Sequence, residues 1–231
     1  MEITAKERAA SAALELVQDG MVLGLGTGST AKYFIDGIGA KVAQGWDLKC
    51  IPTSQPSADQ AMQLGIPLIE PDETTIVDLD VDGADEVDPQ GCLIKGGGGA
   101  LLREKIIAQT ARQFVVIADE SKDVATLGAF PLPVEMDRFG WALTVKAIRE
   151  VLSDLGYGHP NMTLRPLEEG GFFLSDGGHY VLDVSLGQIQ DPVVLDKTLT
   201  QLAGVVTTGI FAGLADKVIL GTSDGVRISD F

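Results

Sequence analysis

The sequence predicts an α/β protein that consists of a parallel-sheet domain and a smaller α+β domain. Up to residue 118, short apolar runs of strand type alternate with helical patterns, an order typical of a parallel sheet covered by helices. Some of these runs, such as residues 114–118, are apolar without alternation, which suits strands covered on both faces. After residue 131 the order becomes strand, helix, two strands, helix, strand, which is the ferredoxin-like order.

The elements of the first domain follow one another from Thr4 onward. Thr4 and Glu7 form a capping-box pattern, which predicts a helix that ends near residue 19. An apolar strand over residues 21–25 then leads into a glycine-rich turn. The other expected elements are helices over residues 31–38, 58–64 and 100–111, and strands over residues 48–52, 66–69, 76–81, 93–95 and 114–118.

The second domain is expected to begin after a boundary near residues 128–131. Its helices are predicted over residues 139–155 and 191–202, the latter with Pro192 at a first-turn position. Its strands are predicted over residues 132–136, 162–167, 172–174, 180–186 and 205–211. A last strand over residues 217–220 is expected to return to the first domain.

Composition and charge exclude several classes of function. Among the 231 residues, 33 are acidic and 17 are basic, so the formal net charge is −16. Nucleic acid and anionic membranes both attract basic surfaces, so neither is an expected partner. The chain shows no signal-peptide pattern and no uncharged apolar stretch of about 18 residues, so we expect a cytoplasmic protein.

The residues that could hold a metal ion or form disulfides are few. Two cysteines, Cys50 and Cys92, lie in apolar runs and are expected in the core. The two histidines show no metal-ligand spacing, so no zinc site is expected. Residues 78–83 mimic half of a calcium-binding loop, but Pro89 stands where that loop needs glutamate, so no metal is predicted.

The turn at residues 26–30, Gly-Thr-Gly-Ser-Thr, predicts an anion site. It is no dinucleotide fingerprint, because Ser29 stands at the third glycine position, and no lysine follows as in a P-loop. It presents hydroxyl groups and N–H groups at the start of a helix, a geometry that favours a compact anion such as a phosphate monoester. A capped helix start with nothing bound is the alternative.

Two further stretches carry candidate chemistry. Asp82 and Asp85 follow a predicted strand and are expected at the carboxyl edge of the sheet, although a solvated acidic loop is the alternative. Lys95 precedes four glycines, which would let a ligand lie against the main chain. Glu104 shares an apolar helical face with neighbours three and four residues away, and an inward carboxylate suits a general base. An exposed Glu104 on a charged surface is the alternative.

Lys122 follows the strongest predicted strand and is expected at the same sheet edge. There it could meet a phosphate or an acidic group, or it could be a solvated loop residue. No nucleophile-elbow motif of the type G-x-S-x-G is present.

Taken in order, these motifs resemble the A type of ribose-5-phosphate isomerase. The resemblance covers nearly the whole chain and rests on residues 26–30, 82–86, 95–105 and 118–122, and it continues through residues 130–135, 182–184 and 221–222. It implies a Rossmann-like catalytic domain over residues 1–129 and 207–231. It also implies a ferredoxin-like α+β domain over residues 130–206 that acts as a lid and in oligomerisation, in a homodimer or homotetramer.

The resemblance implies an enzyme that interconverts D-ribose 5-phosphate and D-ribulose 5-phosphate in the pentose phosphate pathway without metal or organic cofactor. Glu104 would move the proton between C1 and C2 through an enediolate, Lys95 would stabilise its oxygen, and Asp82 and Asp85 would hold sugar hydroxyls and assist ring opening. The substrate-binding residues would be Lys6, Thr27, Gly28, Ser29, Thr30, Asp82, Gly83, Ala84, Asp85, Lys95, Gly96, Gly97, Gly98 and Lys122.

Two other functions are compatible with parts of the sequence. Another sugar-phosphate isomerase or a deaminase could share the glycine turn. A sugar-phosphate sensor, the effector half of a transcription regulator, is a different class, but neither end of the chain shows a basic DNA-binding module.

Overall fold

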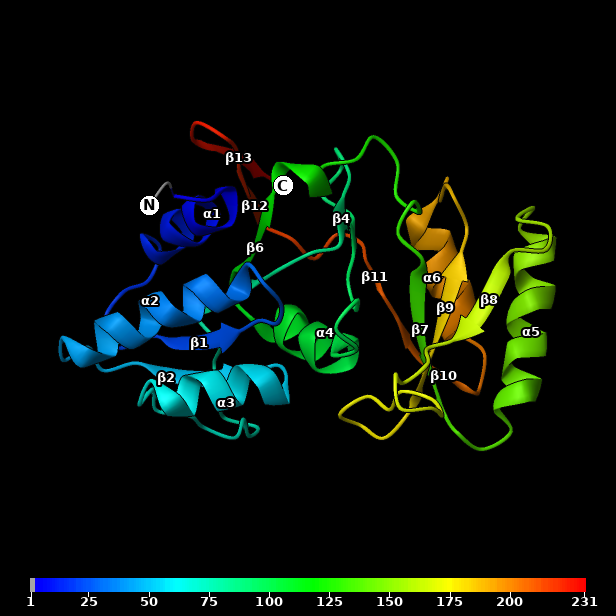
Figure 1. Ribbon diagram of the computed structural model, residues 1–231, viewed down its shortest axis with the longest axis horizontal. Helices are drawn as coiled ribbons and strands as arrows, with labels where there is room; N and C mark the ends of the chain where they lie inside the picture. The colour runs from blue at the N-terminus through cyan, green and yellow to red at the C-terminus, as the bar shows by residue number, and fades with distance from the viewer. Residues whose placement is uncertain (1–2) are drawn as a thin grey trace. The chain divides into compact units, whose positions relative to one another are not determined.

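The computed structural model of the protein describes residues 3–231, and its contacts divide the chain into two compact units (Figure 1). Unit 1 comprises Met1–Ala84, Arg103–Asp123 and Gly213–Phe231, and unit 2 comprises Asp85–Leu102 and Val124–Ala212. Unit 2 therefore takes in residues 85–102, 124–129 and 207–212 in addition to the expected 130–206.

Unit 1 is built around a six-stranded sheet. Its strands are β1 (Val22–Leu25), β2 (Lys49–Pro52), β3 (Leu79–Asp82), β6 (Phe114–Asp119), β12 (Lys217–Gly221) and β13 (Val226–Asp230). Its helices are α1 (Ala5–Leu14), α2 (Ala31–Ala43), α3 (Gln55–Gln63), α4 (Leu101–Thr110), whose first two residues belong to unit 2, and the 3-10 turn η1 (Glu120–Lys122).

The order of the strands in this sheet defines where a ligand site can form. The order is β13-β12-β6-β3-β1-β2, in which the five strands from β12 to β2 run parallel and β13 is antiparallel. The chain leaves β1 toward β2 on one side and then crosses to β3 on the other, so a topological switch point lies between β1 and β3. Sheets of this kind bind ligands outside the carboxyl ends of the strands at such a point.

Helices cover both faces of the sheet in unit 1. On one face, Ala9 of α1 and Phe34 of α2 pack with Leu23, Val81 and other buried strand residues. Ile107 of α4 belongs to a separate apolar cluster with Ile51 and Val77. Figure 1 shows α2 and α3 lying along the β1 and β2 edge of the sheet.

Glycine at position 24 allows α4 to approach the sheet closely. A Cβ there would stand 2.7 Å from Ile107 and 2.2 Å from the Asp80 carboxylate, so no other residue fits without displacement.

Unit 2 contains the predicted ferredoxin-like arrangement. Its elements are β7 (Leu132–Met136), α5 (Trp141–Asp154), β8 (Asn161–Leu164), β9 (Tyr180–Ser185), α6 (Pro192–Thr200) and β10 (Val205–Thr208). The sheet is antiparallel in the order β10-β7-β9-β8, and Ile148 of α5 and Leu195 of α6 pack into one core with it. A three-stranded antiparallel sheet of β11 (Ile210–Phe211), β5 (Leu93–Ile94) and β4 (Glu86–Val87) completes the unit.

The structure corrects several predicted elements. Residues 66–69 and 172–174 form isolated bridges instead of strands, and the predicted strand over residues 205–211 is divided between β10 and β11, which lie in different sheets. α1 ends at Leu14, earlier than predicted, and β13 was not predicted. The return of the last predicted strand to the first domain is confirmed, because β12 pairs with β6. Within residues 3–231, the longest apolar helices fall short of what a membrane crossing requires.

Candidate active site

The loops that follow β1 and β3 meet at the switch point of unit 1. Asp82, the last residue of β3, is fully buried, and its Oδ1 accepts hydrogen bonds from the N–H groups of Thr27 (2.8 Å) and Gly83 (2.6 Å). A Cβ at Gly26 would stand 2.2 Å from the same oxygen, so the first glycine of the turn is required by this carboxylate. The predicted anion turn and the predicted acidic strand end are thus brought together.

A group of hydroxyls supports the turn from within unit 1. The Thr27 hydroxyl donates to Ser54 Oγ (2.7 Å) and lies 3.1 Å from the Thr53 hydroxyl, and Ser57 Oγ donates to the carbonyl of Gly26 (2.6 Å). Thr27 therefore serves as a support for the turn through its side chain. Thr53 and Ser54 carry no motif that marks them in the sequence, although their position directly after β2 places them at the same sheet edge.

A lysine of α1 contacts the anion turn. Lys6 Nζ donates to Ser29 Oγ (2.8 Å), and Thr30 is the N-terminal cap of α2 without a side-chain capping bond. Gly28 has φ +105°, a conformation that favours glycine. A hollow of about 420 Å³ opens beside Gly28 and Ser29, so this turn borders space for a ligand.

Asp119, at the end of β6, lies close to positively charged side chains. Lys6 Nζ lies 3.9 Å from its Oδ2, and the Lys122 charge also acts on it. Partial burial raises the pKa of Asp119, but hydrogen bonds from Ser121 and the charges of Lys6 and Lys122 outweigh burial, and the net pKa is lowered. The carboxylate therefore stays ionised near neutral pH, and Lys6 lies within reach of both Asp119 and Ser29.

Glu104 lies in the first turn of α4 and is 4% exposed. Leu101 and Ala108, which share its helical face, are also buried. The prediction of an inward carboxylate is thus confirmed, and the alternative of an exposed surface glutamate is wrong.

In unit 2, the glycine loop of residues 96–99 is held by Asp85. Asp85 Oδ2 accepts a hydrogen bond from the N–H of Gly97 (2.8 Å), and a Cβ at that glycine would lie 2.7 Å from the carboxylate. Gly96 and Gly99 have φ of +98° and +80° and are joined by a turn hydrogen bond of 2.9 Å. Gly97 and Gly98 at its tip are exposed, so their main chain is open to a ligand.

Lys95 precedes this loop and is 3% exposed. Its N–H donates to the carbonyl of Gly209 (2.8 Å), and its Nζ lies 5.4 Å from the ring centroid of Phe211. A buried ammonium group held against an aromatic face is favourable electrostatically.

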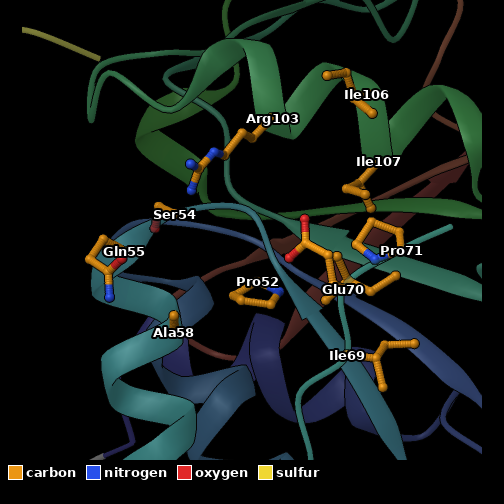
Figure 2. Close-up of a pocket in the computed structure, with 11 residues that line it drawn as sticks. Pro52, Ser54, Gln55, Ala58, Ile69, Glu70, Pro71, Arg103, Ile106 and Ile107 are labelled. Atoms are coloured by element: carbon orange, nitrogen blue, oxygen red, sulfur yellow. The ribbon is translucent and has the colours of Figure 1, made fainter. Parts of the chain in front are cut away.

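A second cavity, of about 370 Å³, lies on the α4 face of unit 1 (Figure 2). Figure 2 shows the Arg103 side chain reaching from α4 towards Ser54 and Gln55, with Ile106 and Ile107 on the same helix. Glu104, the next residue along, is not part of its lining, so α4 directs the two adjacent charges to different surroundings.

The structure thus collects the predicted residues within each unit. Unit 1 holds Lys6, Thr27, Gly28, Ser29, Thr30, Asp82, Gly83, Ala84, Glu104 and Lys122, and unit 2 holds Asp85, Lys95, Gly96, Gly97 and Gly98. Among residues 3–231, no three side chains of the metal-binding types form a group that could hold a metal ion.

Comparison with known proteins gives consistent matches. The family model described as ribose 5-phosphate isomerase A (phosphoriboisomerase A) matches residues 49–225. The ribose-5-phosphate isomerase A of Rhodopseudomonas palustris (strain BisB18) is 49% identical over 96% of both chains. That of Bradyrhizobium diazoefficiens is 47% identical over 96% of this chain and 94% of its own.

Solved structures agree with these sequence matches. Ribose 5-phosphate isomerase A from Methanocaldococcus jannaschii has a TM-score of 0.90, 39% identity and 98% coverage of both chains. A D-ribose-5-phosphate isomerase in complex with phospho-erythronic acid has a TM-score of 0.90 and 40% identity, also with 98% coverage of both chains.

The fold, the site and these matches define an aldose–ketose isomerase. The chain belongs to the ribose 5-phosphate isomerase A family, whose activity interconverts ribose 5-phosphate and ribulose 5-phosphate in the pentose phosphate pathway. The sensor and deaminase alternatives are thereby set aside.

Proposed function

We propose that Glu104 is the general base of this isomerase and moves a proton between C1 and C2 of the sugar through an enediolate. The observation that carries the proposal is the burial of this carboxylate, at 4% exposure, in the first turn of the helix that follows the glycine loop. A carboxylate removed from water is suited to take a proton from carbon and return it.

Lys95 and the glycine loop are proposed to stabilise the negative charge that develops on the sugar oxygen. The ammonium group is buried, and the exposed tip of the loop offers main-chain N–H groups. Fixed donors aimed at a developing oxyanion are commonly the largest contribution to such a reaction.

Asp82 and Asp85 are proposed to hold sugar hydroxyls and to assist ring opening. Each is anchored by main-chain N–H groups, Asp82 by Thr27 and Gly83 and Asp85 by Gly97. A carboxylate fixed in this way has one defined orientation, which suits its proposed part in orienting the sugar. The phospho-erythronic acid complex of the 40% identical relative supports a phosphorylated, hydroxylated ligand.

The phosphate group is proposed to bind at the turn of residues 27–30, with Lys6 and Lys122 supplying positive charge. The helix N-terminus, the Ser29 hydroxyl and the two lysines around Asp119 support this assignment. A dianionic substrate needs such local positive charge on a chain whose net charge is −16.

Lys6→Met is expected to raise KM for ribose 5-phosphate by about 10–100-fold, because a charge-assisted contact to the phosphate is lost. The change in kcat should be smaller, since the phosphate is remote from the reacting carbons. Steady-state kinetics measure both constants.

The matched control for Lys6→Met is Lys49→Met, which removes an exposed lysine at the amino end of β2 in the same unit. Its constants should be unchanged. An equal loss of activity toward unphosphorylated ribose in Lys6→Met would contradict the phosphate assignment.

The proton-transfer route is tested by isotope exchange. Reaction in D₂O is expected to place deuterium at C1 of ribulose 5-phosphate or at C2 of ribose 5-phosphate, because a proton on Glu104 can exchange with solvent while the enediolate exists. NMR of the recovered sugar phosphates measures the incorporation.

Incorporation can be partial, since a shielded carboxyl group returns some protons before they exchange. Full retention of a C2 deuterium label after many turnovers, with no solvent isotope on carbon, would speak for a hydride shift instead.

We propose in addition that residues 130–206 act as a lid and carry the surface for a homodimer or homotetramer. Phe139 and Leu143 support an association surface, because their side chains are 92% and 75% exposed. Sedimentation velocity would disprove it by finding only monomer at working concentration.

A further inference from the structure

Arg165 stands at the end of β8 in unit 2 and is fixed by a carboxylate on the next strand. Its Nε donates to Asp183 Oδ2 (3.0 Å) and its Nη2 to Asp183 Oδ1 (2.6 Å), which is a two-point contact. The side chain is 15% exposed, so the guanidinium plane has one orientation that the pair enforces.

The remaining nitrogen of Arg165 contacts the glycine loop. Nη1 donates to the carbonyl of Gly96 (2.9 Å) and to that of Gly97 (3.1 Å). Asp85 accepts from the N–H of Gly97, so the main chain at this glycine is held from its carbonyl side and from its N–H side.

The segment that follows Arg165 reinforces the same loop. Phe173 donates its N–H to the carbonyl of Arg165 (2.9 Å), and the guanidinium carbon lies 5.7 Å from the Phe173 ring centroid. A Cβ at Gly99 would lie 2.3 Å from that ring, so the loop and the ring are in close contact.

We propose that Arg165 is a positioning residue for the reaction, because it sets the conformation of the glycine loop and of Lys95 directly before it. Four consecutive glycines have more backbone freedom than any other sequence, so this loop needs external contacts to hold one shape. Arg165 also neutralises two carbonyl dipoles that would otherwise oppose negative charge beside the loop. The inference rests on the proposed role of Lys95 and the loop at the developing oxyanion.

Lysine cannot replace this arginine fully. The planar fork serves the two Asp183 oxygens and the two loop carbonyls at once, whereas an ammonium group has no fixed fork. The effect of Arg165 therefore depends on geometry as well as on charge.

The test compares Arg165→Gln and Arg165→Lys with the wild-type enzyme by kcat, KM and two inhibition constants. Arg165→Gln is expected to lower kcat by about 10–100-fold, since a displacement of about 1 Å in such a site costs that much. The inhibition constant of phospho-erythronic acid, which carries a carboxylate at the sugar end, should rise by about tenfold or more. That of inorganic phosphate should stay within about twofold, because the anion turn lies in unit 1.

Arg149→Gln is the matched control, since it removes an exposed arginine on α5 of the same unit, and its constants should equal those of the wild type. Thermal unfolding reports whether each variant is folded. Arg165→Lys retains the charge, and the same kinetic and inhibition constants are measured for it. If Arg165→Gln does not fold, the test rests on Arg165→Lys.

The proposal is overturned if the folded variants keep kcat and the phospho-erythronic acid constant within about twofold of wild type. It is also overturned if the loss of kcat equals the loss of folded protein and the inhibition constant of phospho-erythronic acid is unchanged. If Lys95→Met keeps full activity, the oxyanion role itself fails. If Lys95→Met loses activity and Arg165→Gln does not, only the Arg165 inference fails.

Discussion

Replacing Glu104 with glutamine is expected to lower kcat by about 10²–10⁴-fold without unfolding the protein, because the side chain keeps its size but loses its ability to take a proton. The carboxylate is buried on the inward face of α4, where its neighbours Leu101 and Ala108 are apolar and cannot accept a proton in its place. Initial rates with ribose 5-phosphate measure kcat, and thermal unfolding verifies the fold.

Glu135→Gln is the matched control for this variant. Glu135 is also fully buried, but its carboxylate accepts hydrogen bonds from Ser175 (2.7 Å) and contacts His179 (2.8 Å) within unit 2. This control is expected to lower the unfolding midpoint while kcat stays close to that of the wild type. It therefore separates the effect of changing a buried glutamate from the effect of removing the base. A Glu104→Gln enzyme with nearly normal kcat would remove this residue from the mechanism.

Lys95→Met is expected to lower kcat by about 10²–10³-fold, the effect of removing one donor from a developing oxyanion. Methionine fills much of the same buried volume, so the fold should be retained. The measurement is kcat and KM for both sugar phosphates together with the unfolding midpoint.

The control for Lys95→Met is Lys197→Met, which removes an exposed lysine from α6 of the same unit. Its rates should match those of the wild type. A Lys95 variant whose kcat lies within about threefold of wild type would remove Lys95 from the proposed stabilisation of the oxyanion.

The parts of the fold that the sequence predicted are those with strong local patterns. The unalternating run at residues 114–118 is β6, and the pattern after residue 131 gives the ferredoxin-like sheet. β13 was missed because it is short, all five of its residues are exposed, and only Val226 and Ile228 are apolar. Residues 66–69 are apolar enough for a strand, but only Leu68 pairs with β2, through Cys50. The number of residues that pair depends on the tertiary structure and cannot be read from the local pattern.

The site shows the same division between local and distant information. The inward position of Glu104 follows from helical spacing, and that of Asp82 from its place at a strand end. Arg165 could not be predicted, because it lies 68 residues from Gly97 and no local motif marks it. Only the pairing of β8 with β9 brings it to Asp183 and so gives it a defined direction.

The capping box of α1 stabilises the helical turn that contains Lys6, the lysine proposed to bind the phosphate. Thr4 Oγ1 accepts from the N–H of Glu7 (3.2 Å), and the Glu7 carboxylate accepts from the N–H of Thr4 (2.7 Å), so both ends of the first turn are closed. Lys6 lies inside that turn. Because Lys6 is proposed to bind the phosphate, the apparent affinity for the sugar phosphate is expected to scale with the population in which this turn is wound. Thr4 and Glu7, which lie outside the proposed phosphate site, are thereby expected to set how often the enzyme is ready to receive its substrate.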